Sequence, residues 1–202
     1  MQEGVIKFKI ENWIQTKPLT ESFYKEIEDT RKILYKFNLI GVYKDLNLGF
    51  GNISKKLTGD EFVITGSQTG EYKDLNGSHY TVIKSVDFQT NSVVCEGPIK
   101  PSSESITHAA FYASNKKITS VIHIHSLKLW EKLIENNYLS TSEKAEYGSP
   151  ELSKNIIEIA KNVDLDKPLI VVMKGHKEGI IGAGNNINQT LEELLRIYNL
   201  YL

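Results

Sequence analysis

The chain has 202 residues, a formal net charge of −1 and one cysteine, Cys95. This length predicts a single domain over residues 1–202 with a sizeable core. Within it, residues 1–18 are expected to be an irregular N-terminal arm or a short strand. The small net charge gives no support for nucleic-acid or acidic-membrane partners. A single cysteine excludes an internal disulfide. No apolar run approaches the ~20 residues that cross a bilayer. Because Met1–Gly4 begin no basic and then apolar signal pattern, we expect a cytoplasmic protein.

The first half of the chain predicts one helix followed by antiparallel strands. Apolar residues recur at helical spacing between residues 19 and 37, with Thr20 as a possible N-cap. Strands are expected in 46–54, 61–65, 80–86 and 92–96. Cys95 lies in the last of these strands, within an apolar run, and is expected to be a small core residue.

Glycines mark two turns in this half. Gly49 and Gly51 could let a ligand approach the main chain or could simply form a tight turn. The loop 66–70 places two glycines around hydroxyl and amide side chains, which is compatible with an anion-binding nest of backbone N–H groups and equally with a hairpin turn.

Pro101-Ser102-Ser103-Glu104 is expected to open a second helix, with Ser102 or Ser103 as the N-cap. The N-terminus of a helix carries partial positive charge and free N–H groups, so it can hold an anion. Glu104 has two explanations, because acids are common at helix starts and a carboxylate here could also serve as a general base beside a metal. His108, one turn later, is expected to pack or hydrogen bond.

The segment Ser120–His125 predicts a buried strand with two histidines on one face. Side chains alternate between the faces of a strand, so His123 and His125 point the same way and can converge on one metal ion. Two ordinary strand histidines would give the same pattern.

The last third of the chain predicts helices alternating with a buried strand. Helices are expected at 127–134, 150–162 and 188–202, a polar surface loop at 136–147, and a strand at 168–173. His176 follows that strand between glycines, at a strand end where sites are often built. With His123 and His125 it would complete three imidazole ligands, which leaves a coordination position open as in catalytic zinc sites. His79 is expected in a solvated turn.

Taken in order, these motifs resemble the class II aldolase/adducin family. The resemblance rests on Gly51-Asn52-Ile53-Ser54, Thr69-Gly70, Pro101-Ser102-Ser103-Glu104 with His108, His123-Ile124-His125, a Gly-His turn, and Tyr147-Gly148-Ser149-Pro150-Glu151-Leu152. It covers the chain from about Phe23 to the C-terminus.

The resemblance implies an α/β fold with a mainly antiparallel central sheet flanked by helices. It implies a zinc ion, or another divalent metal, on His123, His125 and His176, with Glu104 as the catalytic acid/base. The residues that would hold a sugar phosphate are Asn52, Thr69, Gly70, Ser102 and Ser103. It further implies a homotetramer and an enzyme of carbohydrate metabolism that cleaves or forms a carbon–carbon bond through an enediolate.

Two local features depart from the family pattern. Gly49-Phe50 stands where a hydroxyl residue often precedes the Gly-Asn pair, and Lys177-Glu178 separates the third histidine from the next glycine. Some relatives use a catalytic tyrosine from a neighbouring subunit, and no motif here matches it. Tyr138, Tyr198 and Tyr201 are candidates. The substrate, phosphorylated or not, therefore stays open. Two alternative functions also stay open. One is an epimerase or dehydratase of a ketose phosphate on the same fold, and the other is a non-catalytic adducin-like interaction domain.

Overall fold

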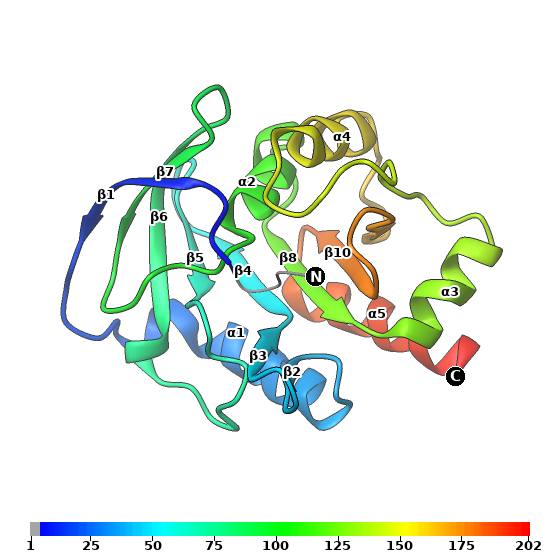
Figure 1. The fold of residues 1–202 in the computed structure, drawn as a ribbon, viewed down its shortest axis with the longest axis horizontal. Helices are drawn as coiled ribbons and strands as arrows, with labels where there is room; N and C mark the ends of the chain where they lie inside the picture. The colour runs from blue at the N-terminus through cyan, green and yellow to red at the C-terminus, as the bar shows by residue number, and fades with distance from the viewer. Residues whose placement is uncertain (1–4) are drawn as a thin grey trace.

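The computed structural model describes residues 5–202, so the first four residues of the expected N-terminal arm lie outside it. Within this range the chain forms an eight-stranded sheet in the order β1-β7-β6-β5-β4-β8-β10-β9, together with a small two-stranded sheet, β2-β3 (Figure 1). Strand β1 pairs parallel with β7, and the other neighbours in the large sheet are antiparallel. The expected mixed α/β fold with a mainly antiparallel sheet is confirmed.

The strands are β1 (Lys9–Ile14), β2 (Gly41–Tyr43), β3 (Leu48–Phe50), β4 (Asn52–Lys56), β5 (Phe62–Thr65), β6 (Tyr80–Asp87), β7 (Ser92–Glu96), β8 (Ser120–His125), β9 (Leu169–Val172) and β10 (Gly179–Gly184). The α-helices are α1 (Glu21–Lys36), α2 (Ser105–Ser114), α3 (Leu127–Glu135), α4 (Pro150–Ala160) and α5 (Ile187–Tyr201), and a short 3-10 helix, η1, covers Gly77–His79.

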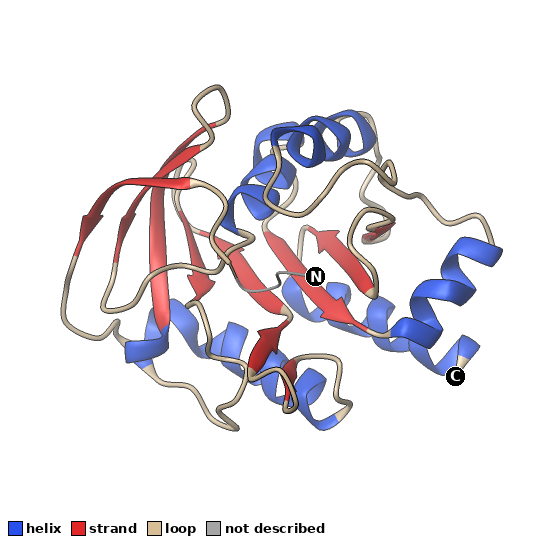
Figure 2. Ribbon diagram, in the orientation of Figure 1, coloured by secondary structure: helices blue, strands red, loops and turns tan. Residues whose placement is uncertain are grey.

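Helices cover both faces of the large sheet (Figure 2). Helices α2 and α4 pack into one apolar core, and α1, α3 and α5 pack into another. Strand β8 contributes to both cores, because Val121 faces the first while Ile122 and Ile124 face the second. Alternation along the strand therefore puts His123 and His125 on the face of α2 and α4.

Helix α1 buries a charged pair as well as apolar residues. Ile27 and Leu34 are fully buried, whereas Phe23 and Phe37, two of the apolar residues that predict this helix, are 40% and 41% exposed. The buried face instead includes Glu28 and Arg31. Arg31 donates to both carboxylate oxygens of Glu28, at 2.7 and 3.0 Å.

The expected start of α2 is wrong by one or two residues. The helix begins at Ser105 with Glu104 at the N-cap position, rather than Ser102 or Ser103. The preceding residues are held against β5 instead, because the Ser102 amide donates to the carbonyl of Thr65 at 3.1 Å. The Ser105 amide then donates to the Ser102 carbonyl at 3.1 Å, which closes a turn before the helix. Glu104 is consequently fixed at the junction of turn and helix.

Among residues 5–202, no helix combines the length and the apolar character that crossing a bilayer requires.

Candidate metal centre

His176 is brought to the two strand histidines by the turn between β9 and β10. The His176 amide donates to the Met173 carbonyl at 3.0 Å, and the Gly179 amide donates to the His176 carbonyl at 2.9 Å. Strand β10 then pairs antiparallel with β8, with Gly179 opposite His125. A side chain at Gly179 would not fit, because its Cβ would lie 2.5 Å from Cδ2 of His176. Glycine at position 179 leaves room for the His176 ring to lie beside His123 and His125.

The three imidazoles form one compact, buried cluster. One ligand nitrogen from each of His123, His125 and His176 lies within 4.8 Å of the others. The Nε2 atoms of His125 and His176 are 3.1 Å apart. Burial lowers the pKa of His125 well below its ordinary value. Burial also lowers the pKa of His176 to about 4, although the nearby Glu104 carboxylate opposes this shift. Both rings are therefore neutral at pH 7, the form that binds metal ions.

Glu104 places a carboxylate at the edge of this cluster. Oε2 of Glu104 lies 2.5 Å from Nδ1 of His123, and Oε1 lies 3.6 Å from Nε2 of His176. Burial alone would raise the pKa of Glu104, but the adjacent His123, followed by His176, lowers it to about 2. The group is therefore ionised at neutral pH.

The donor set fits a divalent cation. Neither Glu104 oxygen, nor Nε2 of His123, has a partner in hydrogen-bond geometry among residues 5–202, although all three atoms are buried. Buried polar atoms without partners are costly, and a cation would satisfy them. Ligand atoms at 2.0–2.1 Å around a tetrahedral zinc ion lie roughly 3.3 Å apart, close to the 3.1 Å between the Nε2 atoms of His125 and His176.

The residues expected to bind phosphate gather in a hollow beside the histidines. Asn52, Thr69, Gly70, Ser102 and Ser103 line it, together with glycines and polar residues of the loop 66–70 and the segment 49–51. It adjoins the histidine cluster, since Asn52 and Ser103 also line the space beside His123. The Thr69 hydroxyl already donates to the Gly66 carbonyl at 2.9 Å, so that proton is used within the loop.

Close backbone packing gives this hollow its shape. A Cβ at Gly70 would lie 2.1 Å from the carbonyl oxygen of Gly41, so only glycine lets the loop 66–70 approach the β2–β3 hairpin. The hollow is thus bounded by two turns and by the residues that precede α2.

Four residues that the sequence analysis gives no role in the site lie near the cluster. The Tyr43 hydroxyl lies 3.0 Å from Nδ1 of His125 and donates to Glu178. The ring centroid of Phe50 is 5.5 Å from that of His125. Tyr147, in the segment expected to be a polar surface loop, is buried, and its ring centroid is 5.1 Å from that of His176. Only the order of motifs around Tyr147 could have drawn attention to it.

His108 makes hydrogen bonds behind the cluster, as expected. Its Nδ1 lies 2.7 Å from the Ser54 hydroxyl, which is 2.6 Å from the Tyr112 hydroxyl. Burial lowers the pKa of His108 to about 3. The ring is therefore a neutral hydrogen-bonding group between α2 and β4.

The cysteine, the turn histidine and two of the tyrosines considered in the sequence analysis make packing or turn contacts instead. Cys95 is buried, and burial raises the pKa of its thiol to about 11, so it is a core residue and no nucleophile. His79 is partly exposed in η1, where its Nδ1 accepts from the Asn76 amide at 3.0 Å. Tyr138 and Tyr201 pack edge to face with ring centroids 6.2 Å apart.

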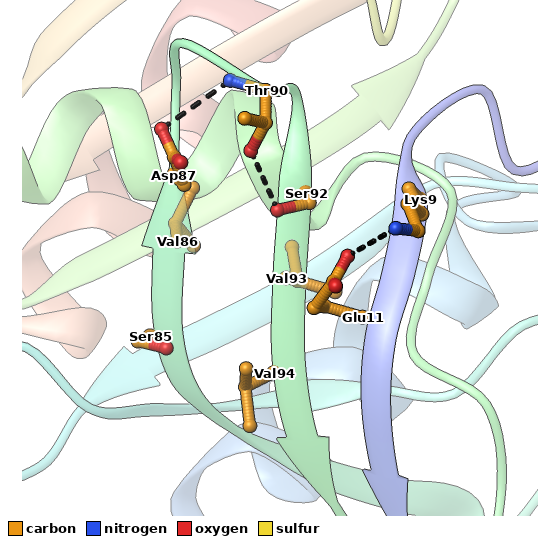
Figure 3. A pocket seen from close by; sticks show the side chains of 9 residues that line it. All are labelled: Lys9, Glu11, Ser85, Val86, Asp87, Thr90, Ser92, Val93 and Val94. Atoms are coloured by element: carbon orange, nitrogen blue, oxygen red, sulfur yellow. Dashed lines mark hydrogen bonds and ion pairs between the residues drawn. The ribbon is translucent and has the colours of Figure 1, made fainter.

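A separate hollow of about 590 Å³ lies over β1, β6 and β7 (Figure 3). Its polar side chains pair with one another: Lys9 with Glu11 at 2.6 Å, Thr90 with Ser92 at 2.9 Å, and Asp87 with the backbone of Thr90 at 3.3 Å. Three strands separate β7 from β8 in the sheet, so this hollow is remote from the histidines.

Comparison with known proteins agrees with this geometry. The sequence profile of the class II aldolase and adducin N-terminal domain matches residues 32–200. Among solved structures, an L-fuculose 1-phosphate aldolase is 22% identical with a TM-score of 0.63, covering 91% of this chain and 86% of its own. YgbL from Klebsiella pneumoniae, described as an aldolase, epimerase or decarboxylase, is 16% identical with a TM-score of 0.65, covering 90% and 89%.

A third similar structure is the L-fuculose-1-phosphate aldolase of Thermus thermophilus, at 18% identity and a TM-score of 0.58, covering 90% of this chain and 96% of its own. Identities this low show a shared fold. The profile match, which spans most of the chain, shows the family. The chain belongs to the class II aldolase and adducin family.

Proposed function

We propose that this protein is a zinc-dependent aldolase that cleaves or forms a carbon–carbon bond in a small sugar phosphate or related hydroxy-ketone. The observation that carries the proposal is the buried cluster of His123, His125 and His176 with the Glu104 carboxylate against it. A binding domain has no need of such a cluster, because burying three imidazoles and a carboxylate without a cation leaves polar atoms unsatisfied.

Each residue of the cluster has a proposed role. His123, His125 and His176 hold the cation, which when bound acts as a Lewis acid toward a substrate carbonyl oxygen. Glu104 moves the proton at the carbon next to that carbonyl. Its depressed pKa keeps it unprotonated and ready to accept a proton at neutral pH. The surrounding burial excludes bulk water from this exchange.

We assign the adjoining hollow to the phosphate of the substrate. Asn52, Thr69, Gly70, Ser102 and Ser103 would surround it, with the N-terminus of α2 at its edge. Backbone N–H groups at a helix start favour an anion without reorganisation. Since the Thr69 hydroxyl donates within its own loop, we expect the donors to phosphate to come from the backbone and the two serines.

The proposal is tested by metal content and by product analysis. The purified chain should hold about one zinc ion per chain, and it should cleave one member of a panel of ketose 1-phosphates, pentulose 5-phosphates and unphosphorylated ketoses. Glu104→Gln should lower turnover by about 10²- to 10⁴-fold, the usual contribution of a general acid or base. Glu192→Gln, an exposed position on α5, is the matched control.

A chain that stays metal-free when zinc is supplied would contradict the proposal, and full activity in Glu104→Gln would contradict the acid/base assignment. Epimerised or dehydrated products from the same panel would identify the second candidate, an epimerase or dehydratase that uses the same metal. We also propose that the enzyme acts in the cytoplasm as a homotetramer, which light scattering on the purified protein would test.

A further inference from the structure

We propose that Tyr43 and Glu178 form a positioning pair that fixes the tautomer and the orientation of the His125 ring. This inference rests on the proposed metal site, because its purpose is to present one nitrogen of His125 to the cation. Neither residue touches the space for substrate in this arrangement. They act through the histidine and are positioning residues.

The three groups form a short chain of hydrogen bonds. The Tyr43 hydroxyl donates to Oε2 of Glu178 at 2.5 Å and lies 3.0 Å from Nδ1 of His125. The 2.5 Å contact is in the range of a charge-assisted bond from a hydroxyl to a carboxylate. Tyr43 comes from β2 and Glu178 from the turn before β10, so the chain joins two distant segments at the histidine.

The chemistry of these groups sets the position of the protons. A carboxylate is only an acceptor, and a hydroxyl has one proton to give. Because the Tyr43 hydroxyl gives its proton to Glu178, its oxygen accepts from His125, which places the ring proton on Nδ1. The lone pair is then on Nε2, the atom that lies 3.1 Å from Nε2 of His176 inside the cluster. Partners of this kind commonly orient histidine ligands and raise their basicity.

The backbone of Glu178 gives independent support. Its φ is +73°, in the left-handed region that favours glycine or asparagine. Of the other non-glycine residues with positive φ in residues 5–202, four are asparagine and one is Gln68. Strained conformations of this kind persist where the surrounding structure holds them, and they cluster at functional sites. The Glu178 carbonyl also accepts from the amide of Ser126, next to His125, at 3.0 Å, which ties the turn to β8.

Packing holds the tyrosine in place. The ring of Tyr43 lies against Phe50, with centroids 4.4 Å apart, and Phe50 in turn lies beside His125. Both aromatic residues belong to the β2–β3 hairpin. The Tyr43 hydroxyl therefore reaches the histidine from a hairpin on which its ring is packed.

The test measures tautomer and metal affinity in Tyr43→Phe, Glu178→Gln and the double variant. Tyr72→Phe is the control, because the Tyr72 ring is 44% exposed and lies against His79 rather than against the histidine cluster. Zinc affinity, measured by competition with a chelator, should fall about 10- to 100-fold in Tyr43→Phe. The double variant should lose no more than Tyr43→Phe alone, because Glu178 acts through the hydroxyl. Thermal unfolding of the metal-free variants checks that each one folds.

Nitrogen-15 NMR of the histidine rings separates this inference from the proposed function. In the metal-free wild-type chain His125 should be the Nδ1–H tautomer, and Tyr43→Phe should change the tautomer or speed exchange of that proton. An Nε2–H tautomer in the wild type, or wild-type zinc affinity in Tyr43→Phe, overturns the pair even if the enzyme is an aldolase. If the chain binds no zinc, the proposed function fails while the tautomer measurement still decides whether the pair exists.

Discussion

Replacing Arg31 with methionine should strongly destabilise this protein, although Arg31 lies outside the metal centre. The guanidinium is 2% exposed and makes a two-point ion pair with Glu28. It also donates to the backbone carbonyls of Tyr72 at 3.1 Å and Lys73 at 2.5 Å. Methionine keeps much of the volume of the side chain and removes its charge and all of these hydrogen bonds.

The expected loss follows from what remains behind. Glu28 would keep two donors, the Tyr80 hydroxyl at 2.8 Å and the Leu75 amide at 2.8 Å, but would lose its buried opposite charge. The other cation near it is the half-exposed Lys32 at 3.9 Å, which also pairs with Asp74. Removing one partner of a buried ion pair costs about 3–5 kcal/mol. For a chain of this size that corresponds to a fall of roughly 6–20 °C in the unfolding midpoint.

Chemical and thermal unfolding at pH 7 measure this loss. Arg196→Met is the matched control, because Arg196 makes the same two-point pair at the same spacing with Glu193, at 2.7 Å for both contacts, but on an exposed surface. We expect that variant to unfold at the wild-type midpoint. A double variant, Arg31→Met with Glu28→Leu, should recover part of the loss since no charge is left unpaired. Equal midpoints for Arg31→Met and Arg196→Met would refute the reasoning.

Three further predictions concern the site. Gly179→Ala should weaken zinc binding at least tenfold in a chelator competition, because its Cβ would lie 2.5 Å from the ring of His176, and unchanged affinity would show that the ring can move aside. In the metal-free protein, stability should be full above pH 6.5 and fall between pH 6.5 and 3, because the unfolded state takes up a proton on His108 before the native state does. Protonation of His108 in the unfolded state alone should lower the free energy of unfolding by about 2 kcal/mol at pH 5. Urea titrations of His108→Gln should then show a flatter dependence of stability on pH. Zinc at 100 times its dissociation constant should raise the free energy of unfolding by about 2.7 kcal/mol, and a chelator should reverse this shift in calorimetry, whereas no shift would argue against a specific site.

Local patterns in the sequence predict much of this fold because they depend on neighbouring residues. The strand β8 follows from its β-branched run, and the shared face of His123 and His125 follows from the alternation of side chains. The expected helix starts at residues 127 and 150 also agree with the structure, in which Ser126 and Ser149 cap α3 and α4. The predicted start of α2 is wrong because Ser102 bonds to β5, a contact between distant residues that no capping pattern contains.

The contacts around the site depend on long-range pairing and could not be predicted in the same way. Tyr43 and Glu178 are 135 residues apart, and they meet only because the β2–β3 hairpin and the turn before β10 reach the same end of β8. The buried pair on α1 escapes prediction for a related reason. Both charges are hydrogen bonded to the backbone of residues 72–75. Hydrophobic periodicity, which places only apolar residues on the buried face of a helix, could not predict them there.

The two halves of the candidate site differ in how freely they could change. His123 and His125 belong to a strand held between two helical layers and paired on both sides, so nearly any alteration there disturbs the core. The adjoining hollow is lined mainly by turns, whose lengths and residues tolerate replacement. New substrates could therefore be reached, in evolution or in the laboratory, by rewriting the turns while leaving the histidine strand untouched.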